Sequence, residues 1–379
     1  MKNGNFWYAI ATLVGTIVGV GIFGLPYAAW QAGFFISALY LFGLFFVFAL
    51  LHLMFGEIIL RTNDGHRLLG YVQIYLGDRA KKSVLFIAIL GALGGMLIYI
   101  LAGGEFLKII FGDFLTDKWQ GYLIFWAIMS AILVVGLKAI KESETIMLIF
   151  MAAVVIFMFV SGLPKIDVSN LFGFNPMNFF TPYGITMFAL AGTVAIPAVR
   201  NILKGSEHQM KSAIIIGTAV PLLFYFLFMI LVVGVSGNAV SEDAVSGLAA
   251  MLGGPIIYLC AVFGILLVAT SYIVFGLYLK DTLVCDLKIN KYLSVLFVLF
   301  IPIALVLLDL GSFAEIIGFL GGVFGGLESI YLVLVYKRAK KSGDRNPEYS
   351  LNIPSLLLNL LIMVFAFGVF YTLFFDGKV

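Results

Sequence analysis

The stretch "TIVGVGIFGLP", residues 16–26, has the spacing of a chemical site. Gly19, Gly21 and Gly24 follow the G-x-G-x-x-G pattern of a loop that binds a pyrophosphate. Such a loop needs a strand before it and an acidic residue about 20 residues later to bind the ribose. The apolar run before the glycines exceeds the usual strand length of about 5–6 residues, and the next carboxylate is Glu57. The pattern does not indicate a nucleotide site.

A second glycine-rich stretch also ends in proline. "GVGIFGLP" ends at Pro26 and "ALAGTVAIP" ends at Pro197. Both residue types break helices, because glycine adopts unusual conformations and proline lacks an N–H donor. A broken helix exposes N–H groups that bind a carboxylate and carbonyls that bind an ammonium group or a metal cation. A zwitterion satisfies both. The alternative is that such glycines only permit close packing, which we favour for Gly91, Gly94 and Gly95.

The composition is that of an integral membrane protein. Of 379 residues, 62% are hydrophobic and 11% are charged, against about 25% charged in soluble domains. The formal charge of +3 gives no support for a nucleic-acid partner. Cys260 and Cys285 have no metal-binding spacing. We therefore expect the lipid bilayer to surround the chain.

The elements that position the two glycine-rich stretches are expected to be membrane-spanning helices of about 20 residues each. The sequence predicts one all-α transmembrane domain, residues 1–379, with eleven spans. They are expected at 5–30, 33–60, 83–111, 121–138, 145–163, 179–200, 213–235, 254–280, 292–310, 312–336 and 353–375.

Basic residues predict the orientation of the spans. Only Lys108, Lys118, Lys165 and Lys378 fall on one side, which leaves 19 of the 23 lysines and arginines on the other. This bias predicts a cytoplasmic N-terminus and an outer C-terminus.

Two loops have apolar residues at helical spacing. The sequence predicts one short helix in "HRLLGYVQIYLGD", on the cytoplasmic face, and one in "SEDAVSGLAAMLGG", outside. Each would cover exposed protein surface, and the outer one is alternatively a lid over an access path.

The spacing of the breaks predicts an inverted repeat. Five spans separate the two glycine-rich starts, so the second set of five enters the membrane upside down, as in transporters with a midplane site. The expected repeats are 5–164 and 179–337, followed by an extra helix at 353–375.

Three segments carry a family resemblance. "GTIVGVGIFGLPYAAWQAGF", "FALAGTVAIPAVRNIL" and "VATSYIVFGLYLKDTL" resemble the first, sixth and eighth helices of the amino acid/auxin permease family, close to its bacterial aromatic and hydroxy amino acid branch. The resemblance implies the five-plus-five inverted repeat of the leucine-transporter fold, with broken helices 1 and 6 and an eleventh helix.

The resemblance also implies site residues. The amides around Gly19, Val20 and Gly21 would bind the substrate carboxylate. The carbonyls of Phe188 and Leu190 would bind its amine, and Thr193 would line the pocket. Because no charged side chain is evident there, we expect a neutral amino acid.

Two coupling ions are compatible with the sequence. By similarity to sodium symporters of this fold, Na⁺ would bind carbonyls of Gly15, Val18 and a residue near Leu267, with the hydroxyls of Thr270 and Ser271. The alternative for these hydroxyls is a hydrogen bond to a carbonyl of their own helix.

Proton coupling would instead use His52 or Glu328, which lie deep in predicted spans, where ionisable groups are functional candidates. We expect Glu57 to pair with Arg61 four residues later. Sodium is slightly favoured.

Together these features predict a cation-coupled symporter of neutral amino acids that works by alternating access in the cytoplasmic membrane of a prokaryote. No enzyme motif is evident, and no cofactor or obligatory protein partner is expected. An amino acid sensor that uses the same site is the alternative.

Overall fold

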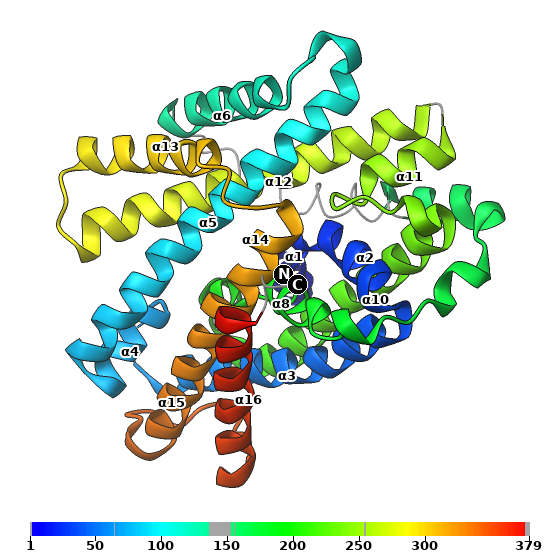
Figure 1. Cartoon of the computed structure of the whole chain (residues 1–379). Helices are drawn as coiled ribbons and strands as arrows, with labels where there is room; N and C mark the ends of the chain where they lie inside the picture. The colour runs from blue at the N-terminus through cyan, green and yellow to red at the C-terminus, as the bar shows by residue number, and fades with distance from the viewer. Residues whose placement is uncertain (1, 64, 136–152, 155, 254, 376–379) are drawn as a thin grey trace.

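The structure is a computed structural model, in which residues 2–63, 65–135, 153–154, 156–253 and 255–375 are described. Helices and loops account for all of these residues, and no strand occurs among them (Figure 1). The α-helices are α1 (Lys2–Ile17), α2 (Gly21–Ala32), α3 (Phe34–Arg61), α4 (Leu68–Leu76), α5 (Asp78–Phe111), α6 (Lys118–Val135), α8 (Thr181–Ala189), α9 (Ile196–Ile202), α10 (Met210–Ser236), α11 (Val245–Leu252), α12 (Pro255–Asp281), α13 (Lys291–Leu307), α14 (Phe313–Phe319), α15 (Gly326–Ser342) and α16 (Ser355–Phe374).

The described residues contain eight helices long and apolar enough to cross a membrane, or nine if the bent pair α1 and α2 is one span. The predicted spans at 292–310 and 145–163 are not in this set. The first corresponds to α13, which has only 17 residues. In the second, residues 145–152 and 155 lie outside the described residues, and the described part includes the short apolar helix Ile156–Lys165. The all-helical membrane fold is confirmed. The number of eleven spans and the inverted repeat stay predictions.

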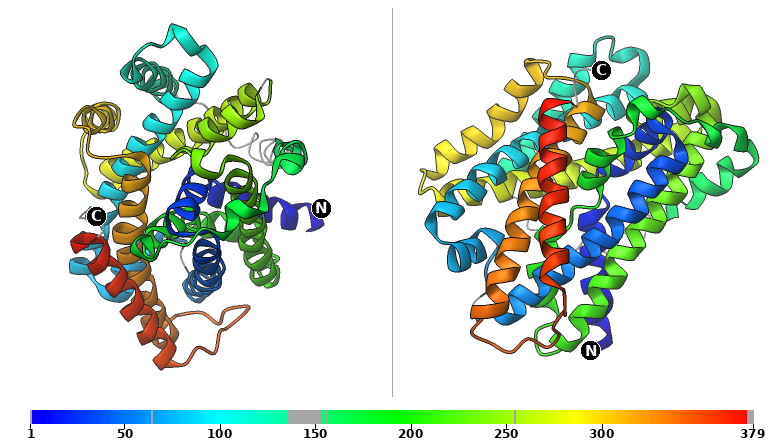
Figure 2. Two further views of the ribbon diagram at one scale, coloured as in Figure 1. Left: turned by 45° about the vertical axis from the view of Figure 1, so that its right-hand side comes forward. Right: turned by 60° about the horizontal axis from the view of Figure 1, so that its bottom comes forward.

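The helices α1, α2 and α8 lie at the centre of the molecule in Figure 1, with α10 and α3 on one side and α5 and α12 on the other. The central helices are tightly associated, since α2 packs on α8 and α1 packs on α10 and α9. The start of α1 and the end of α16 lie at opposite ends of the bundle (Figure 2). Which end faces the cytoplasm stays a prediction.

The predicted span at 312–336 contains an irregularity that the sequence does not predict. It is α14, a π-helical segment (Leu320–Gly325) and α15. At Gly321 an added Cβ would lie 1.9 Å from the carbonyl oxygen of Gly184 in α8. The absence of side chains at these two positions therefore lets the π segment touch α8, and π segments are frequent at functional sites.

Both predicted short helices are present, as α4 and α11. Two contacts join the outer helix and its preceding loop to the rest of the molecule. Lys165 Nζ donates to the carbonyls of Met251 and Leu252 at the end of α11. Glu242 accepts the N–H of Ala314 at the start of α14. These contacts join α11 and the loop before it to the rest of the bundle.

Candidate functional site

The first predicted break is confirmed. The helix α1 ends at Ile17, α2 begins at Gly21, and their axes differ by 52°. The backbone resumes short-range bonding within the first turn of α2, where the N–H of Ile22 donates to the carbonyl of Gly19. Pro26 lies inside α2. The glycines, rather than the proline, therefore mark the break.

The second predicted break is also confirmed. The helix α8 ends at Ala189, and a 3₁₀ turn (Thr193–Ala195) leads into α9. Pro197 is in the first turn of α9, where a missing N–H removes no helical hydrogen bond. Proline here starts the second half of the span, and Gly192 precedes the turn.

The two breaks touch each other. A Cβ added to Gly21 would lie 2.5 Å from the Cα of Ala189, so this glycine permits backbone contact between α2 and the end of α8. On α10, the Tyr225 hydroxyl lies 2.6 Å from the carbonyl oxygen of Ile17 and 2.9 Å from that of Ala189. One buried phenol thus bridges the last carbonyls of α1 and α8.

A cavity of about 420 Å³ opens beside the two breaks. Its walls are mostly apolar, and it extends to Arg67 and Leu68 at the start of α4. Of the six residues predicted to bind substrate, five line it: Gly19, Val20, Gly21, Phe188 and Thr193. Leu190 is not among the lining residues, and its side chain is fully buried. The two breaks therefore share one cavity large enough for an amino acid.

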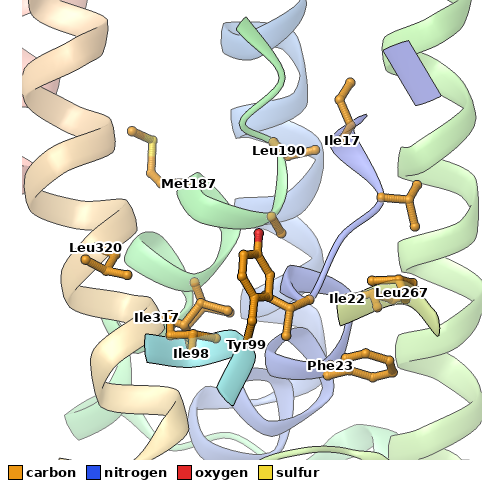
Figure 3. Close-up of a cluster of buried hydrophobic side chains, with 14 of the residues drawn as sticks. Ile17, Ile22, Phe23, Ile98, Tyr99, Met187, Leu190, Leu267, Ile317 and Leu320 are labelled. Carbon is orange, nitrogen blue, oxygen red and sulfur yellow. The ribbon is translucent and has the colours of Figure 1, made fainter. Parts of the chain in front are cut away.

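Tyr99 lines the cavity and was not predicted. It projects from α5, with its hydroxyl oxygen directed into the space between the broken helices (Figure 3). This hydroxyl lies next to the Ser271 hydroxyl on α12. Tyrosines in apolar spans are a signal that could have found both Tyr99 and Tyr225, because a buried phenol needs a hydrogen-bond partner.

Glu328 also lines the cavity. Its Oε1 accepts a hydrogen bond of 2.9 Å from the hydroxyl of Thr193. A charged side chain that was not expected at the site therefore lines the cavity. The sequence placed Glu328 at depth in its span, but the contact with Thr193 joins residues 135 positions apart.

His52 lies behind the second break and is not among the residues that line the cavity. Its Nδ1 is 3.0 Å from the Thr218 hydroxyl, which itself donates to the carbonyl of Ile214. When the Thr218 hydroxyl donates to that carbonyl, a protonated Nδ1 can donate to the Thr218 oxygen. His52 is fully buried against Gly192, and its Nε2 has no partner in the described residues.

The predicted sodium ligands differ in their hydrogen bonds, their exposure and their distance from the first break. The Thr270 hydroxyl lies 3.1 Å from the carbonyls of Leu266 and Leu267 on its own helix, which is the alternative considered for it. Gly15 is exposed. Ser271 on α12 lies near the first break, since its Oγ would be 3.9 Å from a Cβ on Gly19.

Comparisons with known proteins agree with this architecture. The sequence profile of the tryptophan/tyrosine permease family matches residues 2–374. The chain is 26% identical over 246 residues to "Tyrosine-specific transport system 2" of Haemophilus influenzae, which covers 62% of this chain and 59% of that protein. It is 21% identical over 230 residues to "Glutamine transporter 2" of Aliivibrio fischeri, which covers 59% of each. The matched region thus spans less than two thirds of these relatives.

A solved structure has the same fold. It is Mhp1, a nucleobase-cation-symport-1 family transporter in a closed conformation with bromovinylhydantoin bound, with a TM-score of 0.66 and 12% identity. The match covers 98% of this chain and 91% of Mhp1. Resemblance to a transporter family is confirmed, while the amino acid/auxin permease assignment stays a prediction. The profile match over nearly the whole chain establishes that this multi-pass membrane protein belongs to the tryptophan/tyrosine permease family.

Proposed function

We propose that this chain is a secondary transporter that carries a neutral amino acid across the cytoplasmic membrane by cation-coupled symport. The observation that carries the proposal is one cavity lined by both helix breaks. Free N–H groups at the start of α2 and carbonyls at the end of α8 suit the two charges of a zwitterion. Family membership supports transport, rather than sensing by the same site.

The substrate carboxylate would bind the amides around Gly19, Val20 and Gly21, and the carbonyls of Phe188 and Leu190 would bind the amine. The largely apolar cavity suits an aromatic side chain, in line with relatives named as tyrosine transporters. With the N-terminus in the cytoplasm, as predicted, the cavity would open toward the cytoplasm at Arg67. The conformation would then be one that releases substrate inward.

The test of transport is uptake of radiolabelled amino acids by proteoliposomes. We expect tyrosine or tryptophan to accumulate when sodium and proton gradients are both imposed, and not when both are dissipated. Unlabelled neutral amino acids should compete with the label better than lysine or glutamate does. Saturable binding with no accumulation under any gradient would favour a sensor and contradict transport.

For the coupling ion we propose sodium, bound by the carbonyls of Gly15, Val18 and Leu267 and the hydroxyls of Thr270 and Ser271. Uptake should then need external sodium in the absence of a pH gradient. The double variant Thr270→Ala with Ser271→Ala removes two oxygen ligands. It should raise the sodium concentration needed for half-maximal uptake at least about tenfold, as expected for the loss of roughly 1.4 kcal/mol.

The control for this variant is substrate binding at saturating sodium, which should change much less. Protons are the alternative ion, acting through His52 or Glu328. Full uptake in choline buffer, driven by a pH gradient alone, would contradict the sodium proposal.

A further inference from the structure

The carboxylate of Glu328 faces the cavity without a cation beside it. Thr193 donates to its Oε1, and in the part of the chain that the structure describes Glu328 forms no ion pair. Arg67 is the cation in the cavity wall. Its guanidinium is 3.8 Å from Asp281 and lies over the ring of Tyr278. Among the described residues the Glu328 carboxyl group therefore has no cationic partner, so that an ionised carboxylate at this position would be unbalanced.

An unbalanced carboxylate in mostly apolar surroundings is costly, and a cation that enters the cavity offsets that cost. A carboxylate offers about four acceptor positions, of which Thr193 occupies one. The remaining positions are open to a ligand. A group with a positive charge and several N–H donors is the complementary partner.

The location of Glu328 specifies which group of the substrate it meets. Thr193 begins the 3₁₀ turn that lies beyond Leu190, Ala191 and Gly192 after the end of α8, and Phe188 and Glu328 line the same cavity. The end of a helix carries a partial negative charge and free carbonyls. An ammonium group has three donors. Carbonyls at the end of α8 and the Glu328 carboxylate together can accept all three.

We propose that Glu328 binds the α-ammonium group of the transported amino acid and that the Thr193 hydroxyl holds the carboxylate in position. This assignment rests on the proposed function. It makes Glu328 a determinant of specificity, because a ligand without the amine would leave the carboxylate unbalanced. It also leaves the proposed sodium site on α1 and α12 independent of Glu328.

The test compares ligands with and without the amine. Purified protein binds radiolabelled tyrosine in a scintillation proximity assay, and 3-(4-hydroxyphenyl)propionate competes. Tryptophan and indole-3-propionate form a second pair. In the natural protein each amino acid should bind more tightly than its amine-free analogue. In Glu328→Gln this ratio should fall about 10- to 100-fold, the usual range for a hydrogen bond to a charged group.

Two further sets of variants test whether the effect is specific to the Glu328 carboxylate and whether Thr193 positions that carboxylate. Glu348→Gln removes a carboxylate near the surface, where it pairs with Arg345, and should leave the ratio unchanged. Thr193→Val should lower the ratio less than Glu328→Gln does, and Thr193→Ser should restore it.

Four outcomes would overturn the proposal. The first is an unchanged ratio in Glu328→Gln. In the second, this variant binds tyrosine normally and loses only proton-driven accumulation, so that Glu328 carries a proton. In the third, lysine outcompetes both aromatic amino acids and loses this advantage in Glu328→Gln, so that Glu328 meets a side-chain cation. Failure of the natural protein to bind either amino acid would overturn the proposed function as well.

Discussion

The substitution Gly21→Val is expected to weaken amino acid binding by at least about 100-fold while the protein stays inserted in the membrane. A valine side chain at position 21 would cover the free amides that are proposed to bind the substrate carboxylate. The structure adds a stronger reason, because the Cβ would collide with the Cα of Ala189 at 2.5 Å. The two breaks must then move apart, and a displacement of about 1 Å in an organised site can carry a loss of this size.

Binding of radiolabelled tyrosine to purified protein measures this effect. Gly43→Val is the matched control, since Gly43 is exposed on α3 and its added Cβ meets no atom within 4 Å. The variant Gly19→Ala distinguishes covered amides from displaced breaks as the reason for weaker binding. Its added Cβ has space next to Ser271, so it would cover amides without moving the breaks apart. If blocked amides matter, Gly19→Ala also weakens binding. Unchanged affinity in Gly21→Val would refute a site between the breaks.

The breaks could be predicted because their cause is local. Glycine allows the backbone conformations that interrupt a helix, and both breaks occur next to glycines of the two stretches, whereas Pro26 lies inside α2. The composition likewise determines that the helices are apolar enough for a membrane. Resemblance then added the roles of Gly19 and Thr193, both of which line the cavity.

The remaining features depend on contacts between distant segments. Tyr225 bridges the two breaks from α10, and no local pattern marks its partners. Glu328 could be recognised as deep, but its contact with Thr193 depends on how α15 packs in the bundle. The π segment before α15 lies in close contact with α8 at Gly321, and this contact between distant segments has no local sequence pattern.

The contacts of Glu57 also show that local sequence patterns predict nearby partners but not distant ones. The predicted ion pair with Arg61 is confirmed, with 2.8 Å between Oε1 and Nε. The structure adds Lys340 Nζ at 3.0 Å, the N–H of Leu351 at 2.7 Å and the hydroxyls of Tyr336 and Ser350. These donors come from α15 and from the segment 343–354 that follows it. The Glu57 side chain is completely buried.

The substitution Glu57→Ala is therefore expected to destabilise the protein by about 3 kcal/mol, the lower end of the range for removing one partner of a buried ion pair, because Arg61 and Lys340 keep some exposure. The apparent Tm in detergent should fall. Trypsin should also cleave faster after Lys340 and Arg345, since the segment 343–354 loses its anchor.

Glu348→Ala is the control for this variant, because it removes a carboxylate from an ion pair near the surface, which contributes only about 0–1 kcal/mol. Equal Tm values for the two variants would contradict the anchoring role of Glu57.

The expected effect extends to the site, since Glu57 joins the helices whose side chains flank the second break. His52 lies on α3 against Gly192, and Glu328 lies on α15 and accepts from Thr193. Loss of Glu57 frees these two helices to separate, so tyrosine affinity should fall in Glu57→Ala and stay unchanged in Glu348→Ala.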